Sequence, residues 1–392
     1  MLLTVSKTVH AGNVVCVILY LMDRKLAAAI VLLACAGAAT GGFWWYRAFR
    51  AQDARTQALE ESRPILVNPD DIRGVYMTAN IASGKGLSAR LKRDNITKLL
   101  DETEVNGVVI DVKESNGSLV TEGLKKFVQE LGAEPVWKIA RVVVFTDNSQ
   151  VTAHPDWYLA ATGSTVWRDN RGNAWLDPAN KDAQAYLIAF SKSVIDLGFD
   201  EIQFDYIRYP SDGNIGAIRA TGSKRKAISA TFARFSDELR AYKSDIKLSV
   251  DLFGYVTQRP ELSIGQALED AVPHMDYISP MVYPSHYYSG FGVKKDQKRG
   301  LPAVSLSREG ANADPETVVH RSLLSAADTI ASVTTTLRRA KLRPWLQDFS
   351  FGFPYGKKEI TAQITAARKA DTAGWLLWNA GNTYTASALN TE

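Results

Sequence analysis

From about residue 64 to the C-terminus, strand-like segments alternate with helix-like segments. Short apolar, β-branched and aromatic runs predict strands, and longer runs with an apolar stripe predict the helices between them. The predicted strands span residues 72–78, 107–114, 137–145, 198–210, 247–255, 277–283, 344–349 and 374–380, and the clearest helices span 90–102, 124–131, 181–197, 224–243, 318–340 and 359–370. Eight such repeats predict an α/β fold, a (β/α)8 TIM barrel, with a doubly wound sheet as the alternative.

The N-terminal region has a different character. An almost wholly apolar run from Leu26 to Trp45 is about as long as a helix needs to cross a bilayer, and the aromatic residues at 44–46 would lie at the interface. We therefore expect a single-pass protein of the cell membrane, with the barrel on the periplasmic or extracytoplasmic side. The expected parts are a transmembrane signal anchor at 22–46, a stalk at 47–63 and the barrel domain at 64–392.

Two features of this region leave alternatives open. The segment before Cys35 loosely resembles a bacterial lipobox, which would make the chain a lipoprotein, although the apolar run continues past the cysteine. Met22 is followed by charged residues and resembles a natural chain start. Residues 1–21 are then either an over-extended start or a short apolar segment that associates with the membrane.

Composition excludes several functional classes. The net charge of +4 is small and the basic residues are scattered, which argues against nucleic acid as the main partner. Both cysteines lie in the N-terminal region, so the barrel has no thiol nucleophile. The five histidines lack metal-ligand spacing, Lys85 is not followed by the Ser or Thr of a phosphate loop, and there is no Gly-x-Ser-x-Gly elbow. We expect neither a metal nor a cofactor.

The segment from Gly198 to Pro210 contains the most informative predicted strand. Its apolar residues bracket Asp205, so the strand is predicted to be buried and to end in a carboxylate. Carboxylates held in buried clefts are often functional. The alternative is that Asp205 only forms a structural ion pair with Arg208.

Polar residues recur at the ends of the other predicted strands. Because the C-terminal ends of barrel strands surround one mouth, we expect these side chains to converge there. Any one of them alone could be a buried structural group. The candidates are Asp111, Glu114, Arg141, Asp205, Arg208, Asp251, Tyr283, His286, Gln347, Asp348, Trp378 and Asn379.

Aromatic residues accompany these polar groups. The long loop after the third predicted strand contains Trp167, Trp175 and Asp177, and the sixth strand leads into further tyrosines. Flat aromatic faces beside Asp, Asn and Arg suit sugar rings, whose C–H faces stack while their hydroxyls bind polar partners. The alternative is that these aromatics only fix long loops to the barrel, although loops of this length are often functional. We therefore expect a polysaccharide or oligosaccharide to bind at the mouth.

Eight ordered motifs give the chain a family resemblance. From about residue 71 to 385 it resembles the bacterial glycoside hydrolase-like domain family DUF4015, which implies a TIM-barrel hydrolase. The motifs are Arg-Gly-Val-Tyr-Met-Thr at 73–78, Val-Ile-Asp-Val-Lys-Glu at 109–114, Ala-Arg-Val-Val-Val-Phe at 140–145, Phe-Asp-Tyr-Ile-Arg-Tyr-Pro at 204–210, Asp-Leu-Phe-Gly at 251–254, Pro-Met-Val-Tyr-Pro-Ser-His-Tyr at 280–287, Trp-Leu-Gln-Asp-Phe at 345–349 and Gly-Trp-Leu-Leu-Trp-Asn at 374–379.

A more distant resemblance is to the chitinase-type family 18 glycoside hydrolases. Their fourth strand ends in Asp-x-Asp-x-Glu, and the last Glu donates the proton. Gln203, Asp205 and Ile207 occupy the corresponding positions here, so an isoleucine stands at the donor position. The substrate-assisted chitinase mechanism is therefore not expected in this chain.

Glycoside hydrolysis usually needs two carboxyl groups. We expect Asp205, ionised beside Arg208, and Asp251, acting as the acid, to be this pair, because their predicted strands are adjacent. A short separation would give retention of configuration. The reserve candidates are Asp111, Glu114 and Asp348. The alternative function is a catalytically inactive barrel that binds carbohydrate, which the isoleucine at position 207 permits.

Overall fold

The structure is a computed structural model that describes residues 67–163, 166–219, 222–261, 263–335 and 339–391. The expected transmembrane anchor at 22–46 and the stalk at 47–63 lie outside the described residues. Among the described helices, none combines the length and the apolar character that crossing a membrane requires.

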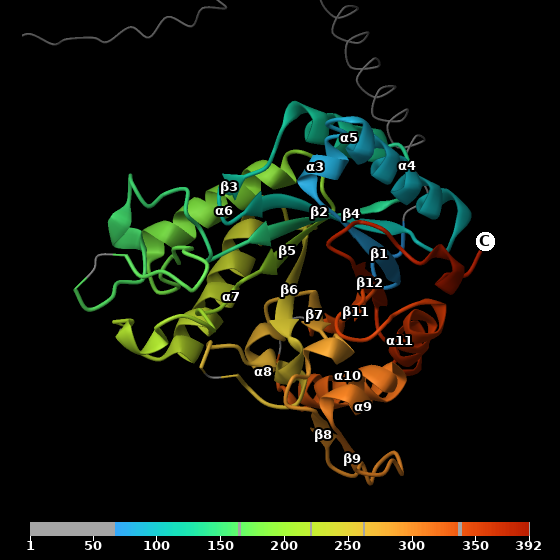
Figure 1. Cartoon of the computed structure of the whole chain (residues 1–392). Coiled ribbons are helices and arrows are strands. Elements are labelled where there is room, and N and C mark those ends of the chain that lie inside the picture. Colours follow the sequence, from blue (N-terminus) through green and yellow to red (C-terminus); the bar gives the residue numbers. More distant parts are fainter. Residues whose placement is uncertain (1–66, 164–165, 220–221, 262, 336–338, 392) are drawn as a thin grey trace, which may run out of the picture. The chain divides into compact units, whose positions relative to one another are not determined.

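Parallel strands form a closed barrel in the described part of the chain (Figure 1). Strand β1 pairs with β2 on one side and with β12 on the other, which closes the ring. A doubly wound sheet would instead leave two open edges, so the barrel prediction is confirmed. In order around the barrel, the strands are β1 (Ile72–Met77), β2 (Gly107–Glu114), β4 (Trp137–Val143), β5 (Glu201–Asp205), β6 (Lys247–Phe253), β7 (Tyr277–Met281), β11 (Trp345–Gln347) and β12 (Gly374–Trp378).

Helices surround this barrel (Figure 1). Most begin at a short polar residue whose side chain accepts a hydrogen bond from a backbone N–H group of the first turn, which is the usual start of a helix. These capping residues are Thr78, Thr121, Asn180, Ser223, Ser307 and Asp314. The helices are α3 (Ala79–Ala82), α4 (Leu87–Glu102), α5 (Glu122–Leu131), α6 (Lys181–Ile195), α7 (Lys224–Tyr242), α8 (Leu268–Ala271), α9 (Arg308–Ala313), α10 (Pro315–Ser332) and α11 (Lys357–Lys369).

Four short strands add to this frame. Strand β3 (Gly117–Ser118) pairs with β2, and β10 (Lys341–Leu342) pairs with β7. Strands β8 (Phe291–Val293) and β9 (Val304–Leu306) form an antiparallel pair of their own (Figure 1).

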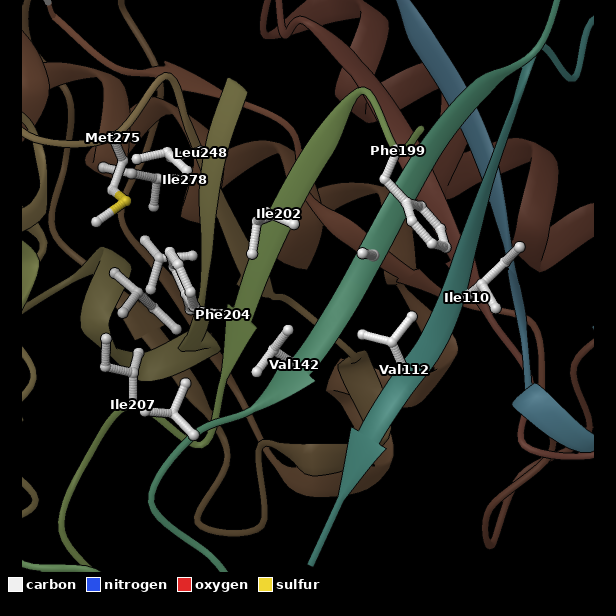
Figure 2. Packing of buried hydrophobic residues seen from close by; sticks show 14 of the residues in the cluster. Ile110, Val112, Val142, Phe199, Ile202, Phe204, Ile207, Leu248, Met275 and Ile278 are labelled. Carbon is white, nitrogen blue, oxygen red and sulfur yellow. The ribbon is translucent and has the colours of Figure 1, made fainter. Parts of the chain in front are cut away.

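Strand alternation divides the core into two layers. Successive side chains of a strand point to opposite faces, so every second residue faces the helices and the others face the barrel interior. Ile110, Val112 and Phe204 belong to the outer layer, which Figure 2 shows beside the strands. Tyr76 and Val109 belong to a separate inner cluster.

The fourth barrel strand, β5, is shorter than the predicted 198–210. It ends at Asp205 because Tyr206 adopts a left-handed backbone conformation with φ of 51°. A residue with a Cβ atom rarely takes this conformation, and doing so costs about 1–3 kcal/mol. The reversal breaks the strand alternation, and Ile207 is buried in the outer layer near Phe204 (Figure 2).

Helix α10 also differs from its predicted span of 318–340. It begins at Pro315, because Asp314 caps it and proline suits the first position of a helix. It ends at Ser332, and Val333 is extended. The β-branched residues that follow lose side-chain freedom in a helix, which favours this end.

A buried ion pair lies at the N-terminal end of the barrel. Nη1 of Arg343 donates to both carboxylate oxygens of Glu201, at 3.0 and 2.8 Å, and neither side chain is exposed. Nε1 of Trp137 donates to the same carboxylate at 3.0 Å, and the guanidinium lies 3.6 Å from the ring centroid of Tyr277. This network joins β4, β5, β7 and the segment before β11.

Candidate active site

A cleft of about 790 Å³ opens at the C-terminal end of the barrel. Its lining includes the last residues of β2, β4, β6 and β7 and the residue that follows β5. TIM-barrel enzymes carry their chemistry at this end, because the loops there surround the mouth. Of the residues predicted for the site, Glu114, Trp175, Arg208, Tyr283 and His286 line this cleft.

Arg141 on β4 joins three of the predicted carboxylates. Its Nε and Nη2 atoms donate to Oδ2 of Asp205 at 3.0 and 2.6 Å. Its Nη1 atom donates to Oδ1 of Asp111 at 2.6 Å and to Oε1 of Glu114 at 2.9 Å. These four side chains from β2, β4 and β5 therefore converge, as the sequence predicts.

Burial and charge act in opposite directions in this cluster. Burial alone would lower the pKa of Arg141, but the attraction of Asp111, Asp205 and Glu114 raises that pKa well above its ordinary value. Burial raises the pKa of Asp111 in spite of the attraction of Arg141. Arg141 thus remains charged and fixes the orientation of the Asp205 carboxylate.

The expected pairing of Asp205 with Arg208 is wrong, because the ionic partner of Asp205 is Arg141. The guanidinium of Arg208 lies instead over the rings of Trp175, Tyr206 and Phe253, at 5.0, 5.0 and 4.6 Å from their centroids. Arg208 stands three residues beyond Asp205, and residues an odd number apart in a strand point to opposite faces, so strand geometry gives the two side chains no shared face.

Asp251 on β6 lies beside Asp205 in the barrel register. The pairing of β5 with β6 aligns Gln203 with Ser249 and Phe204 with Val250, so the next positions are Asp205 and Asp251. Paired strands lie about 4.8 Å apart, and two residues at one register level point to the same face. The two carboxyl groups are therefore neighbours on the interior face.

The surroundings of Asp251 differ from those of Asp205. Asp251 is only 1% exposed, and its Oδ1 atom accepts a hydrogen bond from Nε1 of Trp345 at 2.8 Å. Burial raises the pKa of Asp251 well above its ordinary value, and the nearby charge of Asp205 raises it further. Glycoside hydrolysis uses one ionised carboxylate and one protonated carboxylic acid, and the environments of Asp205 and Asp251 favour these two states.

This raised pKa predicts a pH-dependent effect of Asp251→Asn on stability. The folded state holds the Asp251 proton more tightly than the unfolded state, so stability falls as pH rises above the unfolded pKa of about 4. The variant lacks this penalty and keeps an acceptor for Trp345. We expect it to be more stable at pH 7 by about 1–2 kcal/mol, with the gain shrinking toward pH 4. Thermal melts across this pH range measure it, and a pH-independent difference would contradict the assignment.

An aromatic cluster occupies one side of the cleft. His286 lies 5.3 Å from Tyr283, 5.6 Å from Tyr288 and 5.8 Å from both Phe349 and Phe351, measured between ring centroids. Tyr288 and Phe351 are 54% and 44% exposed, so their rings are accessible to a ligand. Burial, helped by the charge of Arg308, lowers the pKa of His286 and favours its neutral form.

Two residues predicted in the loop after the third strand make contacts within the protein. Trp167 is buried, and its Nε1 atom donates to the carbonyl of Asn214 at 2.9 Å. Asp177 accepts a hydrogen bond from the backbone of Ala179 at 2.9 Å, in the turn before α6. Neither residue lines the described cleft.

Three further predicted residues stabilise loops around β11 and β12. Gln347 donates to the carbonyl of Phe349 at 2.8 Å, and Asp348 accepts from both the backbone and the hydroxyl of Thr385 at 2.9 and 2.8 Å. Asn379 accepts from the backbone of Gly381 at 2.7 Å. None of the three lines the described cleft.

Sequence reasoning missed three residues of the site. Tyr76 donates a hydrogen bond to Asp111 and stacks on Trp378, with 3.9 Å between the ring centroids, and both rings lie near the Arg141 guanidinium. Trp345 contacts Asp251, and Tyr206 lines the cleft. Strand alternation could have placed Tyr76 on the interior face, but the position of Tyr206 depends on its unusual backbone.

The structure also revises the chitinase correspondence. Gln203 is buried and donates to Oγ of Ser279 at 3.3 Å, and Asp205 occupies the expected strand end. Ile207 is fully buried in the outer layer and does not line the described cleft. Position 207 therefore does not face the cleft, so the isoleucine does not stand where a proton donor would act.

The fold resembles that of a solved glycoside hydrolase domain. The PgaB (BpsB) glycoside hydrolase domain from Bordetella bronchiseptica matches with a TM-score of 0.57 and 13% identity, over 80% of this chain and 95% of that chain. The alpha-galactosidase TtGalA from Thermus thermophilus matches with a TM-score of 0.49 and 13% identity, over 81% and 59%. A hypothetical protein from Ruminiclostridium thermocellum matches with 28% identity and a TM-score of 0.39, over 45% and 96%.

Sequence comparison assigns the family. No curated protein sequence matches the chain. The family DUF4015, described as “Putative glycosyl hydrolase domain”, matches residues 120–384, which is more than half of the chain. The expected family resemblance is thereby confirmed: the chain belongs to the DUF4015 family.

Proposed function

We propose that this protein hydrolyses glycosidic bonds of an envelope or extracellular polysaccharide with Asp205 and Asp251 as its two carboxyl groups. The carrying observation is that β5 and β6 pair in register up to Phe204 and Val250, the residues before the two aspartates, with Asp205 paired with Arg141 and Asp251 buried with a raised pKa. Membership of DUF4015 and the barrel shared with PgaB support the reaction class.

In the proposed mechanism, Asp251 donates its proton to the glycosidic oxygen while Asp205 attacks the anomeric carbon. The bond between that carbon and the leaving oxygen breaks, and a glycosyl ester of Asp205 forms. Asp251 then takes a proton from a water molecule, which attacks the anomeric carbon and releases Asp205. Arg141, with the backbone N–H of Tyr206 at 2.6 Å, holds the nucleophile in place.

The proposed mechanism predicts retention of anomeric configuration. Retaining enzymes hold their two carboxyl groups about 5–5.5 Å apart, which neighbouring register positions can provide. The full chain is incubated with bacterial envelope polysaccharides, and released reducing ends are measured. Proton NMR at early times then identifies the first anomer that forms. Release of the inverted anomer would contradict the double-displacement step.

Glu114 is the strongest of the reserve carboxyl groups. Its side chain is 40% exposed and lines the cleft, whereas Asp251 is nearly inaccessible. Should Asp251 prove too deep to reach the leaving oxygen, Glu114 would act as the acid from the same Arg141 cluster. Asp111 and Asp348 remain further candidates; both are buried and, like Asp205 and Asp251, they do not line the described cleft.

The burial of Asp251 also favours a second candidate function, a barrel that binds carbohydrate without cleaving it. A carboxyl group that never reaches the substrate cannot protonate it. Binding of a glycan by the unmutated full chain without any release of reducing ends would favour this function. Release that depends on Asp205 would favour the hydrolase.

We further propose that the protein is anchored in the cell membrane, with the barrel on the extracytoplasmic side. The proposal rests on the apolar run from Leu26 to Trp45. The full chain should stay in the membrane fraction after alkaline extraction, and external protease should degrade the barrel in cells whose outer layer is permeabilised. Complete release by alkali, or full protection from protease, would contradict it.

A further inference from the structure

Arg208 is a buried cation at the wall of the cleft. It follows β5, lines the cleft and is only 7% exposed. The rings of Trp175, Tyr206 and Phe253 surround its guanidinium at 4.6–5.0 Å. Such rings stabilise a cation through their electron-rich faces, but they leave the N–H groups at the edge of the guanidinium without acceptors.

Only some of the N–H groups of this guanidinium donate hydrogen bonds to the protein. Its Nη1 atom donates to the carbonyl of Tyr209 at 3.0 Å and, more weakly, to Oγ of Ser211 at 3.4 Å. Within the described residues, Nε and Nη2 donate no hydrogen bond, and no carboxylate lies within ion-pair distance. A buried charge without an opposite charge is costly, which is why such charges are normally paired.

The acidic residues near Arg208 are engaged elsewhere. Asp205, whose charge acts on Arg208, accepts from Nη2 of Arg141 at 2.6 Å. Asp169 accepts from Nε1 of Trp175 at 3.0 Å, and Asp212 accepts from the backbone of Asn170 at 3.2 Å. Each of these carboxylates has a partner other than Arg208, so the opposite charge is left for a ligand to supply.

We propose that Arg208 binds the carboxylate of a uronic acid, so that the substrate is an acidic polysaccharide. This inference rests on the proposed function, because it assumes that the cleft holds a sugar chain. The two unused nitrogens of a guanidinium match the two oxygens of a carboxylate, which a hydroxyl group cannot reproduce. The surrounding rings lower the local dielectric and thereby strengthen the contact.

The test compares acidic oligosaccharides with their neutral counterparts. Tetramers of glucuronate, galacturonate and mannuronate are each titrated into the full chain beside the same tetramer with its carboxyl groups reduced to alcohols. Fluorescence of the tryptophans, which include Trp175 beside Arg208, reports binding. At least one acidic tetramer should bind about tenfold or more tightly than its reduced form, which is the scale of one charge-assisted contact.

Variants distinguish the effect of Arg208 on binding from the effect of the other positive charges in the cleft. Arg208→Gln should abolish the acid preference, and Arg208→Lys, which keeps the charge but not the paired N–H groups, should restore only part of it. Arg171→Gln is the matched control, because Arg171 lines the same cleft but is exposed. We expect this control to change the preference by less than about threefold, as exposed charges interact weakly. Thermal melts show whether each variant is folded.

Equal affinity for acidic and reduced tetramers, no binding of any uronate, or a preference that survives in a folded Arg208→Gln protein would each overturn the inference. Cleavage is measured separately. Cleavage of reduced tetramers as fast as acidic ones contradicts the role of Arg208 and leaves the hydrolase intact, whereas uncleaved uronates bound through Arg208 contradict only the hydrolase.

Discussion

Replacing Asp205 or Asp251 by Asn should lower kcat for glycan hydrolysis by about a thousandfold or more. Loss of a nucleophile or of a general acid commonly has effects of this size. Asp205→Asn removes the oxygen that attacks the sugar and keeps the side-chain volume. Asp251→Asn removes the transferable proton and keeps the acceptor for Trp345. Reducing-end release by the full-length variants measures both effects.

The leaving group distinguishes the two roles. An aryl glycoside with an acidic phenol needs little protonation, so Asp251→Asn should regain much of its activity on that substrate and Asp205→Asn should not. Asp328→Asn, which alters a surface carboxylate paired with Arg299, is the control for charge and handling. If Glu114→Gln shows the leaving-group dependence and Asp251→Asn does not, the acid is Glu114.

The eight-stranded framework was predictable because the spacing of apolar residues within each short segment indicates whether that segment forms a strand or a helix. Strand β2 occupies the predicted residues 107–114, and the other barrel strands begin within a few residues of their predicted positions. The alternation of strands and helices also predicts that the C-terminal ends of the strands meet at one end of the barrel. Asp111, Arg141 and Asp205 were therefore correctly expected at the same end. Chain order and periodicity were sufficient for this much of the site.

The partner of Asp205 was not predictable in the same way. Arg208 is near in sequence, whereas Arg141 is 64 residues away and reaches Asp205 only after β4 and β5 have paired. Arg208 lies over the rings of Trp175, Tyr206 and Phe253 instead. No periodic pattern encodes a left-handed tyrosine, so the predicted strand continued past Asp205 and placed Ile207 on the wrong face.

The ion pair of Glu201 and Arg343 at the other end of the barrel also joins residues that are far apart in sequence, separated by 142 positions. Replacing either residue alone by Met should lower the free energy of unfolding by about 3–5 kcal/mol, because the remaining charge would be buried without a partner. Chemical denaturation followed by tryptophan fluorescence measures the loss. Two single variants that each lose less than about 1 kcal/mol would contradict the expected dependence on pairing.

The double variant Glu201→Met with Arg343→Met tests whether the charge pair itself contributes stability. It leaves no unpaired charge, so it should recover most of the loss of the single variants, as apolar replacements of buried ion pairs often do. Recovery stays incomplete because Nε1 of Trp137 loses its carboxylate acceptor and the backbone carbonyls of Pro69 and Ala373 lose the Arg343 donor. Losses that simply add in the double variant would mean that the two side chains act independently.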